Sequence, residues 1–108
     1  MSNSVQAFNF GAFLEKEKLK SSGSNFTDWH RSLRIVLTGC KKSNVLDKPL
    51  GDTPADDASH DDLNVYESRS DDYIIVKCMI LQSLEADLQK RFEFHGAYEM
   101  VEELKTMF

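Results

Sequence analysis

The stretch NFTDWHRSLRIVLTG, residues 25–39, decides the fold class of this chain. Its large apolar side chains recur every three or four residues, the spacing that places them on one side of an α-helix. They are Phe26, Trp29, Leu33, Val36, Leu37 and, just beyond, Cys40. Asn25 or Thr27 can cap the first turn, and Gly39 can end the helix. The stretch therefore predicts an amphipathic helix that buries Trp29, while Ile35 points away from the stripe.

Residues 59–84 predict a second, longer helix, with Ser59 in position to cap it. Its stripe consists of Leu63, Tyr66, Tyr73, Ile74, Leu81 and Leu84. Between residues 73 and 81 apolar side chains spread around the rest of the wheel, which is typical of a central helix surrounded by others. The β-branched run at residues 74–76 leaves a buried strand as the alternative, but no second strand-like run is present to pair with it.

The closing stretch AYEMVEELKTMF, residues 97–108, predicts another helix. Its apolar side is formed by Ala97, Met100, Val101, Leu104, Met107 and Phe108. This stripe reaches the last residue without the Gly, Asn or Pro that usually follows a helix end. We therefore expect the chain to be a piece of a longer polypeptide. Met107 and Phe108 are expected either to fold back on the bundle or to contact a partner.

Shorter segments complete the prediction of an all-α bundle of four or five helices. Residues 41–50 form a short element, residues 51–59 a loop, and residues 84–92 a further helix that ends in a corner near Gly96. Residues 25–108 form the helical domain, and residues 1–24 a flexible or docking N-terminal arm. The predicted core is Phe26, Trp29, Leu33, Leu37, Tyr73, Ile74, Leu81, Leu88, Val101 and Leu104.

Composition and charge exclude several classes of protein. The net charge of -5 argues against a dedicated nucleic-acid binder, because affinity for phosphate is supplied by clustered Lys and Arg. Cys40 and Cys78 lie far apart, so we expect two reduced, buried thiols and no metal site. No secretory signal or membrane-length apolar stretch is visible, which predicts a soluble protein in the cytoplasm.

The sequence contains no recognisable catalytic motif and no cofactor-binding loop. The paired aspartates are expected to be solvated, and the three histidines to be surface or structural residues. A modest basic patch, Arg31, Arg34, Lys41, Lys42 and Lys48, is either a solvated face or a contact for RNA or an acidic partner. Enzymatic activity is therefore not expected. A structural protein that assembles with copies of itself, or a module that binds another protein, is the expected function.

The order of several short motifs resembles the Gag region of plant copia-type long-terminal-repeat retrotransposons. The resemblance runs from LEKEKLKSSGSNFTDWHRSLRIVL, residues 14–37, to the closing AYEMVEELKTMF. Its most specific pieces are Asn25, Phe26, Asp28 and Trp29 followed by Leu33, Val36 and Leu37, then Leu88 with Gln89, and finally Met107 with Phe108.

The resemblance implies a fold like the amino-terminal domain of retroviral capsids and a role as a subunit of a virus-like particle. In that family Gag continues into a second helical domain and often a zinc knuckle that binds RNA. Neither is present here, so RNA binding by these residues is expected to be weak or absent. A host gene descended from such an element, which uses the fold as a protein–protein interaction module, is the alternative.

Self-association would require exposed apolar residues, because a shell is built from repeated weak contacts between copies. The candidates are Phe8, Phe10 and Phe13 of the arm, Ile35 on the first helix, and Met107 and Phe108 at the end. A dimer or larger homo-oligomer is expected. A monomer whose core is capped by Phe108 is the alternative.

Overall fold

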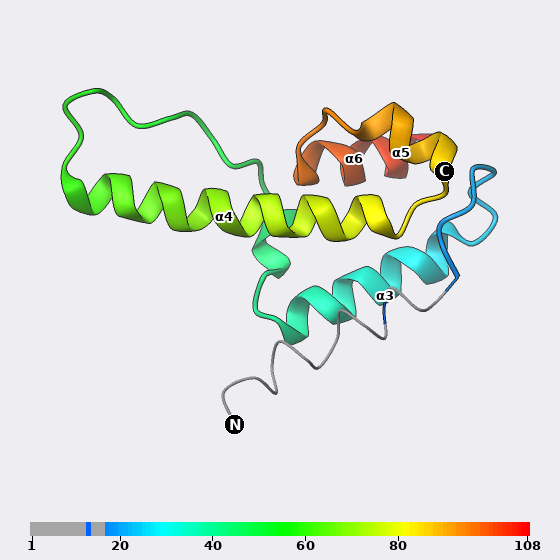
Figure 1. Ribbon diagram of the computed structural model, residues 1–108. Helices are drawn as coiled ribbons and strands as arrows, with labels where there is room; N and C mark the ends of the chain where they lie inside the picture. The colour runs from blue at the N-terminus through cyan, green and yellow to red at the C-terminus, as the bar shows by residue number, and fades with distance from the viewer. Residues whose placement is uncertain (1–12, 14–16) are drawn as a thin grey trace.

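The computed structural model describes Phe13 and residues 17–108 (Figure 1). In this part of the chain it contains four α-helices and one 3₁₀ turn: α3 Phe26–Gly39, η1 Ser43–Leu46, α4 His60–Gln82, α5 Ala86–Phe92 and α6 Ala97–Met107. These residues form no strand, and their only β-type pairing is an isolated bridge between Leu19 and Leu84. The predicted all-α bundle is confirmed.

The long helix α4 organises the molecule. In Figure 1 it runs from the left side of the molecule to beyond its centre, with α3 below it and with α5 and α6 above its C-terminal half. The Ser59 hydroxyl caps its first turn, because Ser59 Oγ accepts a hydrogen bond of 3.1 Å from the Asp62 amide. At its C-terminal end, Gln89 Nε2 donates to the Leu81 carbonyl of α4 at 2.8 Å and to the carbonyl of Leu84, just beyond the helix, at 3.1 Å.

The core lies where α3, η1, α5 and α6 meet the second half of α4. Seven predicted core residues are buried there: Trp29, Leu33, Leu37, Tyr73, Leu88, Val101 and Leu104. Phe26 and Leu81 are partly buried and pack against this cluster. One polar pair crosses the core, because Trp29 Nε1 donates to Ser83 Oγ at 3.1 Å. Ser83 Oγ in turn donates to the Ile80 carbonyl at 2.6 Å, so both buried polar groups have partners.

The prediction that Ile74 lies in the core is wrong, since 55% of this residue is exposed. Neighbouring helices cover only one side of α4, the side that carries Tyr73, Val76 and Ile80. Ile74 and Ile75 lie on the opposite side, so α4 is not surrounded as its apolar composition indicated. Cys78 shares this outward side and is exposed, which also corrects the prediction of a buried thiol.

The described part of the predicted arm, Phe13 and residues 17–24, contributes Phe13 and Leu19 to the core. Leu19 is fully buried, and its amide donates to the Ser83 carbonyl at 2.8 Å. Its carbonyl accepts from the Glu85 amide at 3.1 Å, so this segment is held where α4 ends and α5 begins. Asn25 holds the same segment: its Oδ1 accepts from the Lys20 amide at 3.0 Å instead of capping α3.

Candidate self-association surface

Ile35 is the apolar centre of the outward face of α3. It is 58% exposed, as the helical wheel predicts for a residue outside the buried stripe. Ion pairs hold the arginines on either side of it: Arg31 contacts Asp28 at 3.1 Å, and Arg34 contacts Asp47 at 3.5 Å. Each arginine therefore has a carboxylate partner within the molecule, and the apolar side chain stands between two solvent-exposed ion pairs.

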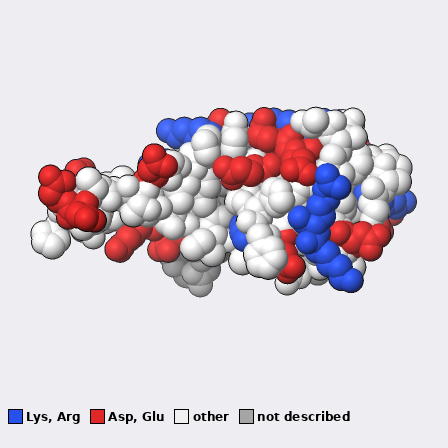
Figure 2. Space-filling model, turned by 90° about the horizontal axis from the view of Figure 1, so that it is seen from above, with Lys and Arg blue, Asp and Glu red and all other residues white. Residues whose placement is uncertain are grey.

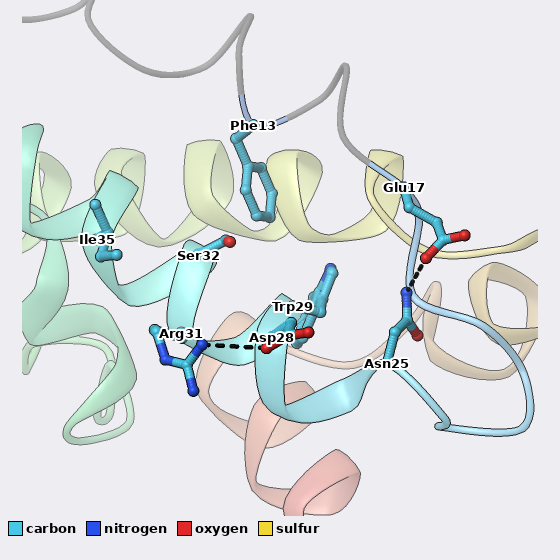
Figure 3. Close-up of a pocket in the computed structure, with 8 residues that line it drawn as sticks. All are labelled: Phe13, Glu17, Asn25, Asp28, Trp29, Arg31, Ser32 and Ile35. Atoms are coloured by element: carbon cyan, nitrogen blue, oxygen red, sulfur yellow. Dashed lines mark hydrogen bonds and ion pairs between the residues drawn. The ribbon is translucent and has the colours of Figure 1, made fainter.

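Two surface hollows border Ile35. The larger has a volume of about 490 Å³ and separates α3 from Phe13 and Glu17 (Figure 3). In Figure 3 the Phe13 ring points toward α3, near Ser32 and Trp29, and Ile35 lies farther along the same helix. The second hollow, about 310 Å³, is lined by Arg31, Arg34, Ile35 and Thr38. Protein interfaces have an apolar core and a polar rim, so Ile35 and the hollows beside it are a candidate contact surface.

Phe13, a predicted contact residue of the arm, is buried in the core cluster. It forms one wall of the larger hollow, so the structure brings it and Ile35 to the same place, although its ring is not an open contact surface. Phe8 and Phe10 lie outside the described residues.

The end of α6 folds back on the bundle. The Phe108 ring lies 5.8 Å from the Phe26 ring, between centroids, and it also covers Gly23. A Cβ atom at Gly23 would collide with this ring, and Gly23 has a φ of +76°, so only glycine suits the position. Phe108 and Met107 nevertheless remain partly exposed. Of the two expectations for Phe108, the structure shows the contact with its own bundle.

His30 lies beside this aromatic contact and carries an unpaired buried nitrogen. Its ring stacks on Phe26, with centroids 5.4 Å apart, and its Nε2 has no hydrogen-bond partner among the described residues. Burial lowers the pKa of His30 below 6.5, and the positive charges of Lys105 and Arg34 lower it further, against a smaller opposing effect of Glu102. The folded protein therefore favours a neutral imidazole at this position.

Sequence reasoning missed Phe94 as a surface residue. Phe94 lies between α5 and α6 and is 91% exposed, whereas Phe92, two residues earlier, is fully buried. The alternating FEF sequence is the only available signal, and it does not indicate which of the two rings faces the core. Ile74, Ile75 and Cys78 are further exposed residues that the helical wheel placed in the interior.

Most residues of the predicted basic patch form ion pairs with acidic residues. Besides the two arginine pairs on α3, Lys42 Nζ lies 2.9 Å from Asp72 Oδ1, so three of its five side chains pair with acids. Figure 2 shows acidic and basic side chains interspersed over α5 and α6, with acidic groups gathered at the free end of α4. The face shown in Figure 2 therefore carries no broad positive surface of the kind that binds nucleic acid.

The described residues contain no candidate metal site and no candidate membrane span. No group of three or more His, Cys, Asp or Glu residues within this part of the chain is placed to hold a metal ion. None of the helices in residues 17–108 combines the length and the hydropathy that a membrane span needs.

No protein-family model, curated protein or solved structure matches this chain.

Proposed function

We propose that this chain is a structural, self-associating subunit of the Gag capsid type, which builds a virus-like particle in the cytoplasm. The single observation that carries the proposal is Ile35, an aliphatic side chain 58% exposed between two hollows and two internal ion pairs. Burial of such a side chain against another molecule is favourable, and the paired arginines do not repel a similar surface.

The helical fold and the motif resemblance support the same proposal. Capsid subunits distribute their function over helix faces and need no catalytic residue, only complementary surfaces that repeat with symmetry. Trp29 and Leu33, two residues of the motif that carries the resemblance, lie on the buried side of α3. Ile35 therefore points away from the bundle. In this proposal the buried stripe holds the subunit together and the opposite side of α3 joins it to others.

Two related properties belong to the proposal. We expect weak or absent RNA binding by these residues, because the net charge is -5 and most of the basic patch is paired internally. No cofactor or enzymatic activity is assigned. The second candidate is a host protein descended from Gag, which would use the same Ile35 surface for a different protein. The exposed Ile35 side chain favours this second candidate as much as the first.

The test is the solution mass across a concentration series, measured by light scattering coupled to size-exclusion chromatography. We expect the mass to rise with concentration, and Ile35→Asp to lower it, because a buried carboxylate without a partner opposes association. Val65→Asp is the matched control, since Val65 is also β-branched, helical and 59% exposed. Circular dichroism checks that both variants keep their helices.

A parent protein that stays monomeric at every concentration contradicts self-association and favours the second candidate, a host protein that binds a different protein. An oligomer that dissociates equally in both variants shows that added charge, and not the Ile35 surface, is responsible.

A further inference from the structure

Phe94 is the most exposed large apolar residue of the described chain, at 91%. It lies in the four-residue connection from Glu93 to Gly96, between the buried Phe92 and the first residue of α6. A fully hydrated phenyl ring is costly, and burying one removes about 150–250 Å² of surface from water. Its own bundle does not cover this ring.

A hollow of about 260 Å³ begins two residues after Phe94. Gly96, Ala97 and Glu99 form one wall, where α6 starts, while Tyr73, Ile74 and Lys77 of α4 form another. The side chain of Ile74 is half exposed at its edge. A cavity of about 150 Å³ already accepts a benzene ring, so this hollow has room for a phenylalanine side chain.

We propose that a second copy of this chain inserts Phe94 into this hollow, and that the exchange is mutual. Phe94 precedes Gly96, in the wall of the hollow, by two residues along the chain, so in this proposal a two-fold rotation brings the ring of each copy to the hollow of the other. This is the self-complementary arrangement that a two-fold interface requires. Ile74 and Ile75, on the outward side of α4, extend the apolar surface around the contact.

The charges at the hollow favour a second copy over an unrelated partner. The lining carries one cation, Lys77, and one anion, Glu99, and the two form no ion pair with each other. In a two-fold contact Lys77 of each copy can meet Glu99 of the other, so the surface is complementary to itself. The two rings together bury only about 300–500 Å², well below a standard interface of about 1,200–2,000 Å², so this contact is weak.

This inference deepens the proposed function and rests on it. A single two-fold contact closes on itself as a dimer, whereas a shell needs at least one further, different contact. The Ile35 surface belongs to α3 and the Phe94 contact to the α5–α6 connection and α4, so the two are separate surfaces of one subunit.

The first experiment compares Phe94→Ser with Val65→Ser by sedimentation velocity over a concentration series. We expect Phe94→Ser to weaken association about tenfold or more, because aromatic anchors dominate small interfaces. Val65→Ser removes an apolar residue from the free half of α4 and should leave association unchanged. Both positions are exposed, so the helical circular dichroism signal should not change.

The second experiment uses charge reversal. Lys77→Glu and Glu99→Lys should each weaken association alone, because like charges then meet across the two-fold axis. An equimolar mixture should regain association close to the parent, since the mixed dimer pairs Glu with Lys at both positions. If Lys77 and Glu99 interacted only within the same copy, mixing the two variants would not restore association.

The outcomes separate this inference from the proposed function. If the parent associates, but Phe94→Ser behaves like Val65→Ser and mixing restores nothing, the Phe94 contact is refuted while self-association stands. If the parent never associates at any concentration, both are refuted. Loss of association in Phe94→Ser together with rescue by mixing supports the contact.

Discussion

Replacement of Trp29 by alanine tests the core most directly. Trp29 is the only tryptophan, is 4% exposed, and connects α3 to the end of α4 through the bond from its Nε1 to Ser83 Oγ at 3.1 Å. Truncation of a buried Trp to Ala typically costs about 3–5 kcal/mol. A domain of this size has a free energy of unfolding of about 5–15 kcal/mol, so Trp29→Ala should remove a large part of it.

Two further variants divide this loss between packing and hydrogen bonding. Ser83→Ala leaves the indole N–H buried without an acceptor, which should cost about 1–3 kcal/mol. Trp29→Phe keeps most of the apolar contact and removes the donor, so it should cost less than Trp29→Ala. In the double variant Trp29→Phe, Ser83→Ala the two losses should not add, because both changes remove the same bond.

Urea unfolding followed by far-ultraviolet circular dichroism is the appropriate assay, because tryptophan fluorescence disappears with Trp29. The midpoint should shift while the slope of the free energy against urea concentration stays constant. If the curves of Trp29→Ala and the parent differ by less than about 0.5 kcal/mol, the effect is that of a surface substitution and the position of Trp29 in the core is wrong. If the losses of Trp29→Phe and Ser83→Ala add fully, the hydrogen bond is not formed in solution.

Two remaining predictions concern the region around the Phe108 ring, where the start of α3 lies near the end of α6. Gly23→Ala should lower the melting temperature, because φ at this residue is +76° and the new methyl group collides with the Phe108 ring. Gly51→Ala is the control, since φ there is +92° but no atom lies within 4 Å of the new methyl group, so it should cost less. Stability should also fall as the pH drops below 6.5, because the unfolded chain then binds a proton at His30 more readily than the folded protein does. His30→Leu should flatten this part of the profile in thermal melts, and an unchanged profile would contradict the assigned role.

The periodicity of the sequence predicts the helices well and the sides that they bury less well. On α3 and α6 the apolar residues occupy one narrow stripe, so the buried side follows directly, as Leu33 and Leu104 show. On α4 apolar residues occur all around, and the pattern cannot distinguish Val76, which is buried, from Ile74, which is exposed. The side that becomes buried depends on where α5 and α6 pack, and this is a tertiary property.

Contacts between segments that are distant in the sequence could not be predicted from its periodicity. Leu19 lies in a charged stretch that has no periodicity, yet it is fully buried because its backbone pairs with Ser83 and Glu85. The bond from Trp29 to Ser83 spans 54 positions and leaves no local signal in either segment. For the candidate site, the wheel correctly placed Ile35 outside, whereas Phe94 required knowledge of how the corner between two helices turns.

The two proposed surfaces lead to different end states when each is removed. Ile35→Asp leaves the mutual Phe94 contact, which closes on itself, so association should stop at a dimer. Phe94→Ser leaves the α3 surface, so any larger species that persists must be joined through Ile35. A variant that carries both changes should be a monomer near 12.3 kDa at all concentrations. Because each contact is small, neither should form a stable particle alone, and assembly requires both surfaces on the same subunit.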